Sequence, residues 1–444
     1  MAVKKNVLLF GAGAVIDWGA PFTYELTETI RKSGWTVTSS NTTITEFIYQ
    51  HLKDTGKFED ADINFETIIN VVEELIVYYS YFDGYRKLPS IVSSFFTPQF
   101  ENEILNFSVE GGKADHGFKL EIPKGKRSEF AKSAVNNETP AQFFLQQLLA
   151  ELLTGIIIRI SKYSYHTKNN SNIITAKNES MNDLFSTWAK RLSNDGTLRM
   201  YTLNYDRNFK IILEKSTDPL TIFEGFDAAD YIDYGANLTA NVPRILHDTK
   251  CHTHYNLHGS AFWGTEARDQ SQLPNPSFYL SASPVLPINA YEQAVWQSEK
   301  GKTLMLTNII TGYQKTQRGI FPPFRQMQAV FDSDCCFADT IYIIGYSFGD
   351  EHINASIKLA VQYNPNVKIV IVDPAFTKNG FDVQVAIKIF SSAGDSDAMR
   401  ATTINKDLHH FFNGKFIVHT KTFKQYLECV VNDSFANLYI HGNI

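Results

Sequence analysis

The sequence predicts an α/β fold with a Rossmann-like parallel sheet, interrupted by a large helical insertion and followed by a small C-terminal α/β extension. Three observations support this prediction. Residues 7–10 form a continuously apolar run that ends at a glycine, which is typical of a strand buried on both faces. Similar runs return only after residue 197. Most of the chain between them, 42–194, shows helical periodicity instead.

Each expected element follows from a local pattern. The predicted strands are short, apolar and bounded by turn residues: 7–10, 198–203, 255–257, 340–344, 367–372 and 415–419. The predicted helices are 22–33, 65–79, 139–156, 181–192 and 422–431, and the third begins with a cap residue before proline, Thr139-Pro140. Further helices are expected between the later strands. Residues 95–128 are rich in Gly, Lys, Glu and Pro and predict a loop or irregular hairpin.

These elements define three regions. The main domain spans 1–375, the helical insertion within it spans 42–194, and the C-terminal extension spans 376–444. An insertion of this length is far longer than an ordinary loop. The insertion helix over 65–79 opens with Asp62, Asn64 and Glu66, which suit the helix dipole, and a gating or partner role is the alternative.

Composition limits the classes of function. The net charge is −6 with no long basic block, so direct nucleic-acid binding is not expected. An apolar content of 43% with 20% charged residues is typical of a soluble globular protein. Residues 4–16 mimic a short signal peptide, but their two glycines and the following Asp17 favour a strand and a turn. Residues 143–160 are interrupted by polar side chains, so we expect a packed helix rather than a membrane span.

The cysteines do not predict a metal site. None of the four has the two-residue spacing of a zinc half-site: Cys251, Cys335, Cys336 and Cys429. Cys251 with His252 and His254 could mimic a metal cluster, but no further ligand spacing supports one. We therefore expect no metal, and the scarcity of cysteine fits a reducing, cytoplasmic location.

Three motifs follow predicted strands. Gly11-Ala12-Gly13 is a candidate nucleotide loop, because glycines allow backbone N–H groups to approach a phosphate closely; a simple strand-to-helix turn is the alternative. The runs 202–206 and 256–260 contain Asn204, Asp206 and His258. The carboxyl ends of parallel strands are where α/β binding sites lie. The other interpretations are a turn for Asn204 and Asp206, and a core histidine for His258.

The order of the motifs resembles the sirtuins: Gly11-Ala12-Gly13, Gly19-Ala20-Pro21, Asn204-Tyr205-Asp206, His258-Gly259 and Gly345-Tyr346-Ser347-Phe348. Residues 344–354 are similar to a segment of bacterial sirtuin-like subunits that act in antiphage defence. The resemblance covers about residues 3–36 and 197–375. It implies that the main domain binds NAD⁺ as a substrate and cleaves it.

The resemblance also implies which residues bind NAD: Gly11, Ala12, Gly13, Gly345, Ser347 and Asp373. The first three would cradle the pyrophosphate. Ser347 would face the adenosine side, and Asp373, after the strand over 367–372, would reach the adenine ribose.

The implied catalytic residues are Asn204, Asp206 and His258, with the first two around the nicotinamide ribose and His258 acting on a ribose hydroxyl or water. Cleavage expels a neutral base from a cationic ring, so the transition state is oxocarbenium-like and needs little acid assistance. An amide such as Asn204 can orient the attacking water or hydroxyl. A histidine that titrates near neutrality can accept its proton.

Departures from the sirtuin pattern favour hydrolysis over protein deacylation. The four-cysteine zinc ribbon of the deacylases is absent, Phe22-Thr23-Tyr24 stands where an Asp-Phe-Arg is expected, and Leu203 replaces a glutamine. The expected reaction is hydrolysis of NAD to nicotinamide and ADP-ribose. A non-catalytic module that senses NAD or an ADP-ribose derivative is the alternative, and an NAD-dependent deacylase is less favoured.

By the same resemblance, the chain is expected to be a regulated effector of bacterial antiphage defence that depletes NAD. Such an activity must be restrained, so we expect a regulatory or sensor subunit encoded nearby and a homo- or hetero-oligomer. The aromatic residues within 78–82 and at 95–96 are candidates for the contact surface, with core packing as the alternative.

Overall fold

A nine-stranded sheet forms the core of the protein, in the order β15-β16-β17-β14-β13-β1-β4-β8-β5. The seven strands from β17 to β5 run parallel, and β15 and β16 add an antiparallel hairpin at one edge. The predicted α/β class with a mostly parallel sheet is therefore confirmed. The computed structural model describes residues 4–34, 36–37, 42–60, 62–78, 140–194, 196–227, 238–266, 277–285, 295–299, 302–305, 307–312, 315, 319–377, 402–405, 407–411 and 414–432.

The strands of this sheet are β1 (Lys4–Phe10), β4 (Gly196–Thr202), β5 (Ile222–Phe223), β8 (His252–Asn256), β13 (Thr340–Ile344), β14 (Lys368–Val372), β15 (Thr402–Asn405), β16 (Leu408–Phe411) and β17 (Phe416–His419). Smaller sheets contain β2 (Thr36–Val37), β3 (Thr42–Thr43), β6 (Phe226–Asp227), β7 (Leu238–Ala240), β9 (Trp263–Glu266), β10 (Ser277–Leu280), β11 (Val295–Glu299) and β12 (Lys302–Met305).

The helices are η1 (Ala12–Trp18), α1 (Thr23–Arg31), α2 (Ile44–Asp54), α3 (Phe65–Tyr78), α6 (Pro140–Ser164), α7 (Glu179–Asn194), α8 (Asn208–Lys215), α9 (Val242–His247), α11 (Phe324–Cys336), α12 (Glu351–Tyr363), η6 (Pro374–Thr377) and α14 (Phe423–Asn432). Among the described residues, no helix is long and apolar enough to span a bilayer.

Strand β1 lies at the centre of the seven parallel strands, and its neighbours end level with it. Phe10 pairs with Ile344 of β13 on one side and with Thr202 of β4 on the other. After β1, the chain first forms β4, β5 and β8 on one side of β1. It then crosses over to form β13, β14 and β17 on the other side. The carboxyl ends of β1 and β13 therefore flank a topological switch point, which is where open α/β sheets form their ligand crevice.

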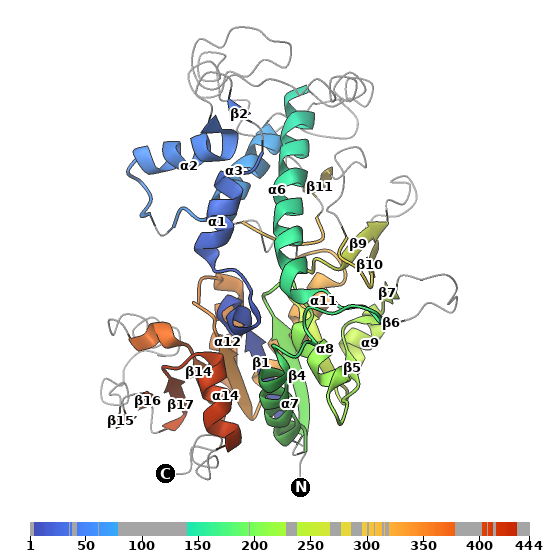
Figure 1. The fold of residues 1–444 in the computed structure, drawn as a ribbon, viewed down its shortest axis with the longest axis vertical. Helices are drawn as coiled ribbons and strands as arrows, with labels where there is room; N and C mark the ends of the chain where they lie inside the picture. The colour runs from blue at the N-terminus through green and yellow to red at the C-terminus, as the bar shows by residue number, and fades with distance from the viewer. Residues whose placement is uncertain are drawn as a thin grey trace.

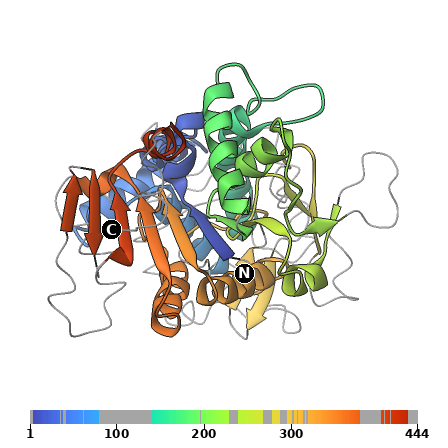
Figure 2. The same cartoon turned by 90° about the horizontal axis from the view of Figure 1, so that it is seen from below.

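Helices cover both faces of the sheet. α7 and α14 pack together on one face, and α11 and α12 pack together on the other (Figure 2). On the first face, Trp18 at the end of η1 contacts the rings of Phe185, Phe209 and Phe423. Its indole Nε1 donates a hydrogen bond of 2.8 Å to Asn182 Oδ1. This packing fixes the segment that follows β1.

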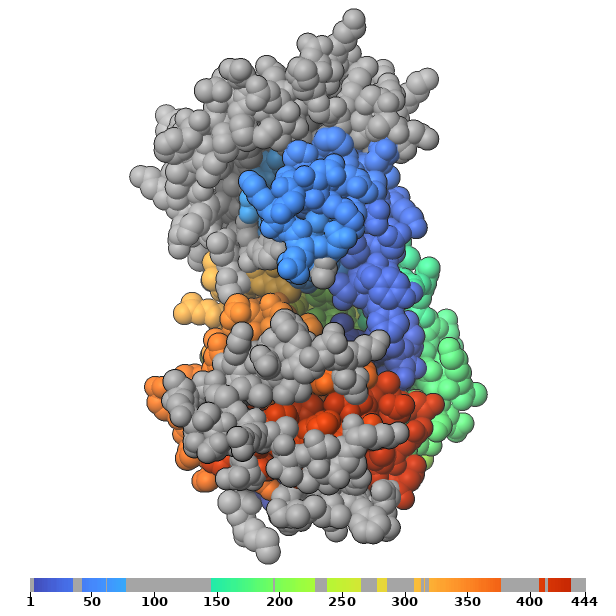
Figure 3. All heavy atoms as spheres, turned by 90° about the vertical axis from the view of Figure 1, so that its left-hand side faces the viewer, coloured from blue at the N-terminus to red at the C-terminus, as the bar shows by residue number. Residues whose placement is uncertain are grey.

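The insertion helices stand above the carboxyl edge of the sheet (Figure 1). Among the described helices α6 is the longest, with 25 residues, and it packs against α3 and α1. α7 is predicted as the end of the same helical block, but it contacts β4 and belongs to the layer that covers the sheet. The space-filling view shows a recess between the insertion and the sheet layer (Figure 3).

Several predicted boundaries need correction. The helix predicted over 139–156 extends to Ser164, and the strand predicted over 255–257 begins at His252, so His252 and His254 belong to it. The strand predicted over 415–419 is β17, which pairs with β14 and so extends the main sheet. The predicted loop over 95–128 lies outside the described residues, as do the aromatic positions 79–82 and 95–96.

Candidate functional site

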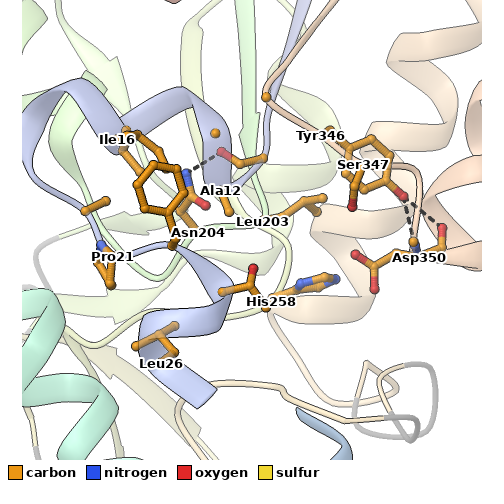
Figure 4. A pocket seen from close by; sticks show the side chains of 18 of the residues that line it. Ala12, Ile16, Pro21, Leu26, Leu203, Asn204, His258, Tyr346, Ser347 and Asp350 are labelled. Atoms are coloured by element: carbon orange, nitrogen blue, oxygen red, sulfur yellow. Dashed lines mark hydrogen bonds between the residues drawn. The ribbon is translucent and has the colours of Figure 1, made fainter. Parts of the chain in front are cut away.

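A cavity of about 1050 Å³ lies at the carboxyl edge of the sheet. The segments after β1, β4, β8, β13 and β14 line it from below, and the ends of α3 and α6 line it from the insertion. Asn204, His258, Ser347 and Asp350 lie around it in Figure 4. Of the residues that the sequence predicts for the site, all except Asp206 line this cavity. Its volume is close to the upper limit for ligand pockets, about 1000 Å³.

The glycines after β1 interlock with the segment after β13. Gly11 N donates to Ile344 O and Gly13 N donates to Gly345 O, both at 2.9 Å. A Cβ at Gly11 would lie 2.4 Å from Gly345 O, and one at Gly13 would lie 2.7 Å from Gly345 Cα. The N–H groups of both glycines are thus already used, so they are not the phosphate donors that the motif suggested. Their role is to let two backbones meet.

The side chain of Asn204 joins the cavity wall to the same glycine segment. Its Nδ2 donates to Gly11 O at 2.9 Å, and the residue is 8% exposed. No hydrogen bond to its Oδ1 occurs within the described part of the chain, so the amide carbonyl is available to a ligand. The hydrogen bond from Nδ2 to Gly11 O holds that carbonyl in one orientation.

The two sequence runs are joined by side chains that do not face the cavity. Asn256 Nδ2 donates to Asn204 O at 3.0 Å and to Asp206 O at 2.8 Å. Ser260 Oγ donates to Tyr205 O at 3.0 Å. Asn256 and Ser260 therefore hold the segments after β4 and β8 together, while Asn204 and His258 line the cavity.

Asp206 does not reach the cavity, contrary to the sequence prediction. It is fully buried, its Oδ1 accepts from Asn208 N at 3.1 Å, and its Oδ2 accepts from Tyr163 Oη at 3.0 Å. The first bond is an Asx turn that leads into α8, the alternative that its residue type left open. Burial raises the pKa of Asp206 to about 6. Asp206 thus supports Tyr163, which does line the cavity.

His258 is 3% exposed and its ring contacts a second histidine on the cavity wall. Its Nε2 lies 3.3 Å from Nε2 of His352, the second residue of α12. Burial, followed by the positive charge of Lys315, lowers the pKa of His258 to about 3. The expectation that His258 titrates near neutrality is therefore wrong for this structure: its imidazole is neutral at neutral pH and acts as a hydrogen-bonding group.

A lysine bridges two carboxylates beside these histidines. Lys315 Nζ lies 2.6 Å from Asp350 Oδ1 and 2.9 Å from Glu66 Oε2. Burial raises the pKa of Glu66, although Lys315 opposes this. Burial also acts against ionisation of Asp350, but the positive charge of Lys315 and its hydrogen bond to Oδ1 outweigh it and lower the pKa. The bridge connects α3 of the insertion to the start of α12, so the insertion forms part of the site.

The segment after β13 is fixed by its own side chains. Phe348 has a left-handed φ of 59°, and Asn354 Nδ2 donates to its carbonyl at 2.8 Å. Tyr346 Oη donates to Asn354 Oδ1 at 3.0 Å and accepts from Asp350 N at 3.0 Å. These bonds stabilise a conformation that a bulky residue rarely adopts. They leave Ser347 exposed at the cavity.

Asp373 lines the cavity from the segment after β14. Its Oδ1 accepts from Ala375 N at 2.8 Å, and its own N–H donates to His419 O at 3.0 Å. The side chain is half-buried and lines the cavity. It directly follows the strand, as the sequence predicts, and the following turn sets its orientation.

The cavity is acidic. Its described lining contains six carboxyl groups and one lysine: Asp17, Asp62, Glu66, Asp350, Glu351, Asp373 and Lys315. Such a lining attracts cationic groups and disfavours anionic ones. The acidic residues at 62 and 66, at the start of α3, therefore contribute to the cavity wall in addition to their place at the helix terminus.

Sequence reasoning missed Tyr163, Lys315, Asp350 and His352 as site residues. Asp350 and His352 belong to the segment 344–354 that carries the resemblance, and their place at the start of a helix after a glycine-rich turn was the available signal. Lys315 and Tyr163 carry no local signal. Among the described residues, the ligand atoms of Cys251, His252 and His254 do not come together as a group that could hold a metal ion, and Leu198 N donates to His252 Nδ1.

Comparison of the chain with protein-family models gives no match, and comparison with curated proteins gives none either.

Proposed function

We propose that the protein hydrolyses NAD at the nicotinamide–ribose bond. One observation carries the proposal: Asn204, His258 and the glycine segments after β1 and β13 come from distant parts of the chain and line one cavity at the switch point of the sheet. This is the place where α/β folds bind nucleotides. The proposal also rests on the sirtuin resemblance of the same residues.

The charges in the cavity suit the chemistry at the nicotinamide end. Nicotinamide in NAD is cationic, and the transition state of its loss spreads positive charge over the ribose. Asp350 lies beside His258, Lys315 bridges it to Glu66, and these carboxylates would stabilise such charge in a partly buried site. The nicotinamide ribose is therefore proposed to lie near His258, with the adenosine toward Ser347 and Asp373.

Asn204 and His258 are proposed to position the nucleophile. The Oδ1 of Asn204 accepts a hydrogen bond from a water or a ribose hydroxyl, because its Nδ2 is committed to Gly11. The neutral imidazole of His258 accepts a second hydrogen bond and takes the proton after the bond to nicotinamide has broken. Asp206 acts only through Tyr163. A role as a restrained effector of antiphage defence rests on the resemblance alone.

The test is release of nicotinamide from NAD, followed by chromatography, with the purified chain alone and with the proteins encoded beside its gene. His258→Ala should lower the rate by at least about 100-fold, the usual scale for a positioned proton-transfer group. Asn204→Ala should lower it by about 100-fold, the scale for lost positioning of a reactant. His254→Ala is the matched control, because His254 is equally buried on β8 and does not line the cavity. Binding of NAD without any release would support the sensing module instead.

A further inference from the structure

Three potential metal ligands meet on one wall of the cavity. The ligand atoms of His258, His352 and Asp350 all lie within 4.8 Å of one another. His258 comes from the segment after β8, and the other two come from the start of α12. They therefore meet only through the fold, and two imidazoles with one carboxylate form a common ligand set of transition metals.

The spacing of the two histidines fits a shared metal better than a hydrogen bond. Their Nε2 atoms are 3.3 Å apart. Two nitrogens bound to a tetrahedral zinc ion at about 2.0–2.1 Å are separated by about 3.3–3.4 Å. A strong hydrogen bond from an N–H group is shorter, about 2.9–3.0 Å. The two ring nitrogens thus already stand at the separation of neighbouring ligands.

The third ligand retains a free oxygen. Lys315 donates to Oδ1 of Asp350, and no hydrogen bond to Oδ2 occurs among the described residues. A metal bound at Oδ2 would leave Lys315 as an outer partner that orients the carboxylate, as such partners do at metal sites. The acidic lining of the cavity raises the local concentration of cations.

We propose that His258, His352 and Asp350 bind one divalent transition metal ion of the zinc class. All three line the cavity, so the ion keeps a coordination position open toward it, as catalytic zinc sites do. Two imidazole ligands argue against Mg²⁺ and Ca²⁺, which prefer oxygen. The proposal does not depend on NAD hydrolysis.

The test is titration of the chelator-treated, full-length chain with Co²⁺, followed by its visible absorption, and then displacement by Zn²⁺. We expect one ion per chain with the intense bands of four-coordinate Co²⁺. Loss of an outer-shell partner weakens metal binding by at least about tenfold. His258→Ala and His352→Ala each remove a direct ligand, so each should weaken binding by more than that. His247→Ala, which removes an exposed histidine of α9, should leave binding unchanged.

X-ray absorption of the wild-type zinc complex tests the same site without a variant. Two histidine nitrogens and at least one oxygen at about 2.0–2.2 Å are expected. No binding at equimolar metal, or binding that survives both cavity substitutions, would overturn the proposal. A shell of oxygen ligands alone would do the same.

Discussion

Replacement of Gly345 by alanine should destabilise the protein much more than the same change at Gly56. Both glycines have nearly the same left-handed φ, 60° and 61°. A Cβ at Gly345 would lie 2.3 Å from Ala14 N, whereas one at Gly56 meets nothing within 4 Å. The left-handed conformation costs an L-residue about 1–2 kcal/mol at either position. Overpacking adds about 1–3 kcal/mol at Gly345, for a total of about 2–5 kcal/mol.

Urea unfolding of the two variants and the wild type measures this difference. The Gly56→Ala variant should lose about 1 kcal/mol in free energy of unfolding, because the smaller entropy of its unfolded chain offsets part of the strain. The pair isolates the steric cost, since the two glycines have nearly the same φ. Equal losses in the two variants would show that the segments after β1 and β13 do not interlock as described.

Two further predictions concern the pKa of Asp206 and the proposed metal site. The pKa of Asp206 is raised from 3.8 to about 6 in the folded state, so its contribution to stability is complete below about pH 4 and is lost as the pH rises through 6. Asp206→Asn should therefore gain up to about 3 kcal/mol relative to wild type between pH 4 and pH 7 in urea unfolding, and a constant difference would contradict the shift. If the proposed hydrolysis holds, equimolar Zn²⁺ should inhibit nicotinamide release, because the ion occupies Nε2 of His258. A chelator should restore the release. An unchanged rate with zinc bound at His258 would contradict the proposed role of that nitrogen.

The sheet was predictable because its central strands are apolar runs bounded by turns. The strand predicted over 340–344 is β13 with the same bounds, and Thr139-Pro140 marks the start of α6 within one residue. Strands such as β5 and β6 have two residues each and carry no periodicity to detect. They form because larger neighbours bring their backbones together.

The site was predictable only where strand ends fix position. Asn204 and His258 follow β4 and β8, and parallel strands bring their ends to one edge. An aspartate such as Asp206 is common both in turns and in catalytic sites. Only its hydrogen bonds with Asn208 and Tyr163 show that it belongs to a turn here. Lys315 meets its partners through tertiary packing, which no local pattern records.

The central claim is that water cleaves NAD in this cavity. Its most direct test is mass spectrometry of the products formed from NAD in ¹⁸O-labelled water, with wild type and His258→Ala side by side. We predict nicotinamide together with ADP-ribose that carries one ¹⁸O atom, formed by wild type and at least about 100-fold more slowly by the variant. Release of nicotinamide with unlabelled product, or equal labelled product from the His258→Ala variant, would contradict the account.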